Sequence, residues 1–227
     1  MKKIVLATVL AACVSSAFAA DTATLKVKGT LTTGVCTPTL SNGGEVDFGI
    51  IELSTLSAST INQLGQKTLT LSINCDNPTK VAFTTMDDRQ DSLKNINIVG
   101  GGADGRDIPE TSGQYGLGKT AEGVNIGAYS IAVDTALVTT EAGSKATIDQ
   151  ELNAEEWINS TAGITLDGRS GFGRKFTVAD TGTIVPIAFT EAVFPLLVTA
   201  AIDSTTNLGI TDNTPLDGQA TISLVYL

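Results

Sequence analysis

The sequence contains no histidine, and this absence removes several kinds of chemistry. Without an imidazole the chain cannot form a Ser-His or Cys-His nucleophile pair, nor a histidine-based metal site. Neighbouring carboxylates such as Asp87 and Asp88, or Glu155 and Glu156, would point to opposite faces of a strand instead of converging on one bond. The sequence therefore predicts no enzyme activity, no catalytic residue, no metal site and no cofactor.

Basic residues and aromatic residues are also scarce. Lys and Arg number 14 against 24 Asp and Glu, and aromatic residues make up 5% of the chain. An acidic chain is poorly suited to nucleic acid or to anionic membranes as partners. Beyond the N-terminal segment no apolar run approaches the ~18 residues that span a bilayer. The low charged fraction, with abundant Thr, Gly, Val and Ile, favours a β protein that is soluble or assembled.

Residues 1–19 have the pattern of a secretory signal peptide. A pair of lysines forms the positive n-region, Ile4–Val14 is an apolar h-region, and Ala17–Ala19 is a small-x-small cleavage site. The mature chain is then expected to begin at Ala20.

A second processing signal overlaps the first. Leu10–Cys13 resembles a lipoprotein box, which would make a lipidated Cys13 the mature N-terminus. Its h-region, Ile4–Leu10, would lie at the short end of the usual ~7–15 residues. Cleavage after Ala19 is therefore preferred, and lipidation of Cys13 stays open as the alternative.

Two cysteines remain in the mature chain, Cys36 and Cys75. An even count in an exported protein predicts one disulfide between them. Closing a loop of about forty residues would stabilise the fold by roughly 4 kcal/mol in the chain-entropy model. A free thiol or a cysteine metal site is the weaker alternative, because nothing else ligand-like lies nearby.

The segment Thr24–Cys36 alternates in a way that predicts a strand. Its apolar or small positions are Leu25, Val27, Gly29 and Leu31. This strand could belong to the protein's own sheet, or it could be donated to a neighbouring subunit. The glycine inside the strand fits either a local bulge or a shallow notch in an acceptor groove.

Further strands are expected along the chain, broken by Gly/Pro turns, and they predict a single antiparallel β-sandwich domain. Val81–Met86 should form a hairpin with the strand before it, and Pro186 and Pro195 should place their segments at sheet edges or bulges. The expected strands are Val46–Ile51, Lys67–Cys75, Val81–Met86, Val124–Val138, Phe172–Ala179, Thr183–Phe189 and Val193–Ile202.

The chain closes with one more alternating stretch. Ala220, Ile222, Leu224 and Tyr226 form one apolar face of this last strand, which runs on to Leu227.

Two long segments are expected to lie on the surface, namely the glycine-rich Gly100–Gly127 and the acidic Glu141–Ser160. A short helix around Ile148–Ile158 is expected in the second. Its Trp157 fits a side chain that covers the sandwich better than a ligand-stacking residue. Asp87–Asp91 fits a solvated turn better than a calcium site, because it lacks the EF-hand spacing.

Several stretches of this chain occur together behind the signal peptide. They are the Thr24–Leu31 segment running into Cys36, the Ile73–Cys75 segment, the Pro-Thr-Lys-Val-Ala-Phe run at 78–83, and Tyr226 as the penultimate residue. In combination they resemble the major pilin subunits of chaperone–usher fimbriae, in particular the beta-type fimbrial branch.

The resemblance implies an all-β, immunoglobulin-like sandwich that lacks its final strand. Residues 20–33 would be an N-terminal donor-strand extension carrying Leu25, Val27, Gly29 and Leu31, and 34–227 the pilin domain. A periplasmic chaperone and neighbouring subunits would contact a groove beside the last strand. Its contact residues would be Ala220, Ile222, Leu224, Tyr226 and Leu227.

The implied function is that of a structural fimbrial subunit. It would be exported through the periplasm, passed to an outer-membrane usher and polymerised at the cell surface by donor-strand exchange, in support of cell adhesion. A single-domain fimbrial adhesin, or a lipid-anchored β-sandwich that binds carbohydrate, is the alternative.

Overall fold

The computed structural model describes residues 26–29, 35–170, 173–210 and 213–227. The chain divides into two compact units, Met1–Thr32 and Thr33–Leu227. In the first unit only 26–29 are described; their side chains are exposed and they belong to no strand. The predicted signal peptide, Leu25 and Leu31 lie outside the described residues.

The described part of the second unit is built mainly from β-strands. The strands are β1 (Cys36–Leu40), β2 (Asn62–Thr79), β3 (Val81–Asp87), β4 (Tyr115–Gly116), β5 (Gly127–Val133), β6 (Thr139–Thr140), β7 (Gly143–Ser144), β8 (Ala146–Glu151), β9 (Ile158–Asn159), β10 (Arg174–Ala179), β11 (Phe189–Ile202) and β12 (Ala220–Tyr226). One short helix, α1 (Thr205–Leu208), follows β11, and 3-10 turns span Ser41–Gly44, Leu53–Thr55, Gln90–Ser92, Thr111–Gly113 and Gly168–Ser170.

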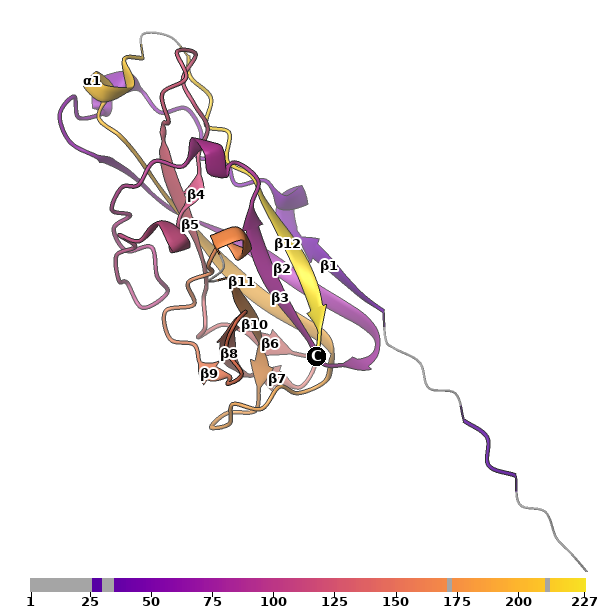
Figure 1. Cartoon of the computed structure of the whole chain (residues 1–227). Helices are drawn as coiled ribbons and strands as arrows, with labels where there is room; N and C mark the ends of the chain where they lie inside the picture. The colour runs from indigo at the N-terminus through magenta and orange to yellow at the C-terminus, as the bar shows by residue number, and fades with distance from the viewer. Residues whose placement is uncertain (1–25, 30–34, 171–172, 211–212) are drawn as a thin grey trace, which may run out of the picture. The chain divides into compact units, whose positions relative to one another are not determined.

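The strands form two antiparallel sheets that pack as a sandwich, as predicted (Figure 1). The first sheet has the order β1-β2-β11-β5-β4, with β6 and β7 attached beside β11. The second has the order β12-β3-β10-β8-β9. β1 is therefore an edge strand of the first sheet and β12 an edge strand of the second.

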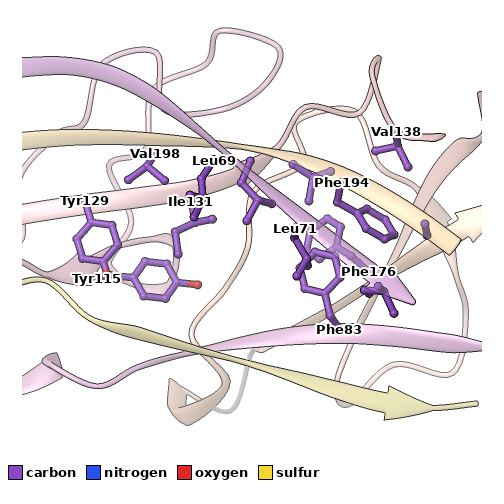
Figure 2. Close-up of a cluster of buried hydrophobic side chains, with 14 of the residues drawn as sticks. Leu69, Leu71, Phe83, Tyr115, Tyr129, Ile131, Val138, Phe176, Phe194 and Val198 are labelled. Carbon is purple, nitrogen blue, oxygen red and sulfur yellow. The ribbon is translucent and has the colours of Figure 1, made fainter. Parts of the chain in front are cut away.

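The core between the sheets has two aromatic centres (Figure 2). The ring of Phe83 lies 5.7 Å from that of Phe176 and 5.1 Å from that of Phe194. Tyr115 and Tyr129 stack at 5.4 Å at the other end of the cluster. These side chains come from both sheets, so they join the two layers.

The predicted hairpin between the second and third strands is wrong. β2 pairs with β1 and β11, whereas β3 pairs with β12 and β10. Only Lys80 separates the two strands, and the chain crosses there from one sheet to the other. Alternation in each strand was read correctly, but it does not say which sheet a strand joins.

Three further expectations about elements need correction. Residues 148–158 contain the end of β8 and the start of β9 rather than a helix, and the structure assigns no strand to Val46–Ile51. In the predicted strand Thr183–Phe189 only Phe189 is part of a strand. The two misplaced strands share a cause, because each stretch alternates without a neighbouring ladder to pair with.

Pro195 lies in an inner strand, not at an edge. β11 pairs with β5 from Leu196 onwards and with β6 up to Val193, so the proline falls between these two ladders. Its carbonyl accepts a hydrogen bond from the Asp134 N–H at 2.8 Å. The missing N–H therefore falls where β11 changes partner, which is why proline is tolerated there.

The glycine-rich segment is more buried than expected. Ile98 and Ile108 bridge each other and form a small separate core together with Ile96, Ala128 and Ala201. The acidic segment is also partly structural, because β8 lies between β10 and β9 in the second sheet. Neither segment is simply a surface insertion.

Candidate functional site

The last strand has one bonded edge and one open edge. Within the described residues, β12 pairs with β3 alone, in a continuous register from Ala220 opposite Asp87 to Tyr226 opposite Val81. A strand edge that carries no neighbour presents a row of backbone donors and acceptors. The free edge of β12 is therefore open to pairing with a further strand.

In β12, the residues whose backbone groups face the free edge are the same residues whose side chains face the core. The Asp88 N–H donates to the Gln219 carbonyl, and the Leu227 N–H donates to the Lys80 carbonyl. Because hydrogen-bonded and non-bonded pairs alternate in an antiparallel ladder, odd-numbered residues bond to β3 and even-numbered residues turn their backbone groups outward. The even-numbered residues are Ala220, Ile222, Leu224 and Tyr226, and the first three of these pack on the core.

An apolar cavity of about 240 Å³ lies beside the first half of β12. Ala220 and Ile222 line it from the last strand. Its floor comes from the first sheet and consists of Leu69, Tyr129, Ile131, Leu196 and Val198. The sandwich is thus incompletely filled along the side where β12 has no neighbour, and we call this cavity with the free edge of β12 the groove.

The opposite wall of the groove was not recognised as part of it from the sequence. Val46 and Phe48 are half-buried and line the cavity, while Glu45, Asp47 and Gly49 are exposed. This alternation is that of a strand, yet the segment belongs to no ladder. The predicted strand at Val46–Ile51 was the available signal for this wall.

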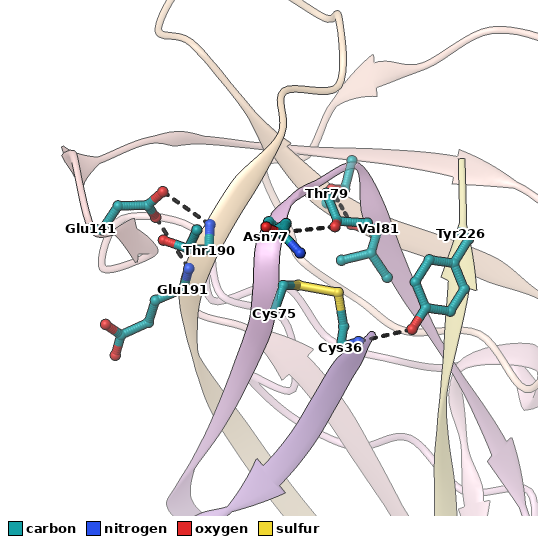
Figure 3. Close-up of a disulfide and its surroundings, with 10 residues drawn as sticks. Cys36, Cys75, Asn77, Thr79, Val81, Glu141, Thr190, Glu191 and Tyr226 are labelled. Carbon is teal, nitrogen blue, oxygen red and sulfur yellow. Dashed lines mark hydrogen bonds between the residues drawn. A yellow bond between two sulfur atoms is a disulfide. The ribbon is translucent and has the colours of Figure 1, made fainter. Parts of the chain in front are cut away.

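A hydrogen bond and a disulfide lie at the Tyr226 end of β12 (Figure 3). The Cys36 N–H donates to the Tyr226 hydroxyl at 2.9 Å, which joins β1 to the end of β12. Cys36 also faces Cys75 in the β1–β2 register, and the predicted disulfide between them is confirmed. We call this the basal end of the unit.

At its other end the groove adjoins a larger cavity of about 520 Å³, which polar residues such as Glu45 and Asp47 line together with apolar ones. We call it the apical chamber; its apolar lining includes Ile51, Leu53, Leu56, Ile126, Ile202 and Leu208. The two cavities share lining residues, namely Gly44, Val46, Phe48, Leu216 and Gly218. The shared residues show that groove and chamber adjoin.

Gly218 allows the Tyr129 ring to pack closely against the backbone at this junction. A Cβ at this position would lie 2.7 Å from Tyr129 Cε1 and 3.3 Å from Leu117 Cδ1. Atoms that close cannot coexist without a shift, so any side chain here must displace the tyrosine or the chain. The absence of a side chain at 218 is therefore a requirement of packing.

A buried polar network holds the chain beside the junction. The Asp87 carboxylate accepts hydrogen bonds from the Arg89 and Gly116 N–H groups, both at 2.8 Å, and its burial raises its pKa. The Tyr115 hydroxyl bonds to Thr85 Oγ1 at 2.6 Å. Asp87 is fully buried, so the prediction of a solvated turn at Asp87–Asp91 is wrong at its first residue.

Two of the predicted donor residues, Val27 and Gly29, are among the described residues, and both belong to the first unit. Val27 is 89% exposed, and Gly29 has no atom within 4 Å of a built Cβ. Of the predicted groove residues, Ala220, Ile222 and Leu224 pack on the core, whereas Tyr226 and Leu227 are about half exposed.

The chemistry available at the groove is apolar contact and backbone hydrogen bonding. In the part of the chain that the structure describes, no group of three acidic or cysteine side chains could hold a metal ion. The helices among those residues are too short or too polar to cross a membrane. Trp157 is half-buried, with Lys175 Nζ 5.5 Å from its ring.

Comparison with known proteins places the chain in a family. Residues 25–130 match the model of a family described as "Protein of unknown function (DUF1120)". The chain is 34% identical over 229 residues to "Uncharacterized protein YhcF" of Escherichia coli K12, with 93% of each chain covered. It is also 34% identical over 229 residues to "Protein GltF" of the same strain, covering 89% of this chain and 87% of the relative. The chain belongs to the DUF1120 family. The family description and both relatives' names state no activity.

Proposed function

We propose that this protein is a structural subunit of a surface fimbria that polymerises by donor-strand exchange. The groove beside β12 accepts the N-terminal extension, residues 20–33, of the next subunit. Before assembly a periplasmic chaperone covers the same groove, and an outer-membrane usher exchanges the two. The observation that carries the proposal is the free edge of β12 beside an unfilled apolar cavity.

The groove offers both kinds of contact that strand addition needs. An added strand forms main-chain hydrogen bonds along an exposed edge, and its alternate side chains enter pockets. The even-numbered residues of β12 supply the free backbone groups, and Ala220 and Ile222 line the cavity. A strand placed there would complete the second sheet.

The N-terminal extension has the matching pattern. Its apolar or small positions recur every second residue, as do the inward positions of β12. These positions are Leu25, Val27, Gly29 and Leu31 on the extension and Ala220, Ile222, Leu224 and Tyr226 on β12. Burying each large side chain of the extension would contribute ~1.5–3 kcal/mol. Added over Leu25, Val27 and Leu31, this contribution is large compared with the free energy of unfolding of a typical domain.

A pair of variants in β12 tests the proposal. Ile222→Asp puts a charge on the groove face, whereas Ser223→Asp puts the same charge on the exposed face of the same strand. We expect the exported wild type and Ser223→Asp to give a ladder of heat-sensitive multimers on SDS gels of unboiled samples. Ile222→Asp should give monomer, because a buried unpaired carboxylate opposes strand insertion.

A synthetic peptide of residues 20–33 tests binding from the donor side, because a substitution in the peptide leaves the fold of the subunit unchanged. It should bind the wild type and Ser223→Asp but not Ile222→Asp, and the same peptide carrying Val27→Asp should bind none of them. A single monomer band for the exported wild type would contradict the proposal. Carbohydrate binding that survives deletion of Ala20–Leu31 would instead favour an independent adhesin or lectin.

A further inference from the structure

We propose that the apical chamber of one subunit is covered by the basal end of the next subunit, in a body-to-body contact distinct from strand insertion. The inference rests on the proposed donor-strand function. It adds a second interface that the groove alone does not require. Its occupant is a second copy of this chain.

The short connection between the extension and the body forces the two bodies together. The last apolar position of the extension is Leu31, and Val35 already belongs to the body, since its carbonyl accepts the Asp76 N–H at 3.0 Å. Four residues span at most about 14 Å when fully extended. A subunit whose Leu31 sits in its neighbour's groove must therefore hold its own basal end against that neighbour.

The direction of the inserted strand determines which end of the neighbour is touched. Every ladder in the sheet of β12 is antiparallel. A strand that continues this pattern runs from the Tyr226 end of β12 towards Ala220, and its C-terminal end leaves the groove near Gly218. Gly218 lines both the groove and the apical chamber. The donor body thus emerges beside the chamber.

The basal end carries exposed apolar side chains. Val35 precedes Cys36 and is 61% exposed, and Val185 is 62% exposed in the turn before Pro186. Pro186 bridges to Ala179 at the end of β10, and β10 is tied to the basal residue Val81 by the Thr177 hydroxyl. Figure 1 shows this turn near the C-terminus and α1 at the far end.

The two ends of the unit are therefore complementary and different. One offers a chamber of about 520 Å³ with Leu53 and Leu56 among its lining residues, and the other offers exposed apolar side chains. Contacts between unlike surfaces are heterologous, and they generate open filaments when the rotation between copies does not close a ring. Such a contact would join the same two successive subunits that strand insertion joins.

Engineered cysteines test the contact directly. A chain with Leu53→Cys at the chamber and Val185→Cys at the basal end, exported and oxidised, should form a ladder that survives boiling and collapses on reduction. The matched control is Val99→Cys with Val185→Cys. Val99 is 53% exposed, against 40% for Leu53, but it does not line the chamber. The control should show only the heat-sensitive ladder.

A charge variant gives a second readout. Val185→Asp should lower the temperature at which unboiled multimers dissociate, while binding of the free 20–33 peptide, which lacks a body, stays unchanged. A heat-sensitive ladder without covalent links in the Leu53→Cys, Val185→Cys chain would overturn the contact and leave strand exchange standing. Absence of any ladder in the wild type, together with no peptide binding, would overturn both.

Discussion

At the scale of single residues, Gly218 is the position where the smallest change should have a clear effect. Gly218→Ala places a methyl group 2.7 Å from Tyr129 Cε1, inside the contact distance of two carbons. We expect this overpacking to lower the free energy of unfolding by about 1–3 kcal/mol. Urea denaturation of the purified chain measures it.

The control for this variant is Gly29→Ala. A Cβ at Gly29 meets no atom within 4 Å, so the added methyl group has nothing to displace. The unfolding transition should stay at the wild-type urea concentration. Equal transitions for the wild type and Gly218→Ala would show that Tyr129 can move aside freely.

Single residues also differ in how far the sequence could predict them. The Cys36–Cys75 bridge was predictable, because two cysteines remain once the expected signal peptide with Cys13 is set aside, and an even count favours pairing. The burial of Asp87 could not be predicted, because its environment comes from Gly116 and Asp167, which are distant in sequence. A local run of acidic residues contains no information about those partners.

At the scale of elements, β1 depends on its disulfide. This strand has five residues, lies at a sheet edge and pairs only with β2 among the described residues. Reducing the bridge, or replacing Cys36 and Cys75 by serine, reopens a loop of sequence separation 39. We expect the free energy of unfolding to fall by roughly 4 kcal/mol in the chain-entropy model.

Denaturation with and without reductant measures this effect. The Cys36→Ser, Cys75→Ser chain is the control, because its stability should not respond to reductant. If the reduced wild type unfolds at the same denaturant concentration as the oxidised protein, packing alone holds β1 in place.

Elements were predictable where their pattern is local. The alternation in β12 and the apolar run in β5 correctly indicated strands, because side-chain periodicity is a property of the segment itself. Pairing was not predictable, as the β2–β3 error shows. The helix predicted around residues 148–158 was also wrong. β8 is a strand because it pairs with β10, and nothing in the acidic segment encodes that neighbour.

The candidate site was likewise only partly predictable from the sequence. The apolar face of β12 was readable from the sequence, whereas the wall at Val46 and Phe48 and the apical chamber were not. Those cavities are made by segments that meet only after folding. A cavity is a property of the folded unit, so no single stretch of sequence predicts it.

At the scale of the whole molecule, the buried carboxylate of Asp87 predicts a dependence of stability on pH. Burial raises its pKa above the usual 3.8, against the lowering effect of the Gly116 and Arg89 N–H groups. Nearby Asp167 raises this pKa further and Arg169 lowers it. A raised native pKa means that the contribution of this group is fully present below pH 3.8 and is lost as the pH rises through the raised value.

Comparison with Asp87→Asn isolates this contribution. The unfolding free energy of the wild type minus that of the variant should fall as the pH rises from about 3.8. Asp107→Asn should show the opposite sign, because the Asn97 side chain and the Gly100 N–H lower the pKa of Asp107. The Asp87 difference changes as the pH rises above 3.8, whereas the Asp107 difference is complete above 3.8 and is lost as the pH falls below it. Urea titrations on both sides of pH 3.8 give both curves, and slopes of the same sign would refute the assignment.

The alternation of β12 also fixes how this strand tolerates change in its length. Each even-numbered residue carries both a side chain that faces the sandwich and backbone groups that face the free edge. A substitution alters one pocket contact and leaves the backbone pattern intact. An inserted or deleted residue between Gly218 and Ala220 would either slide the strand against β3 or turn Thr221 and Ser223 inward. Variation among relatives in the length of the loop after α1 should therefore stop before residue 218, while individual side chains beyond it remain free to vary.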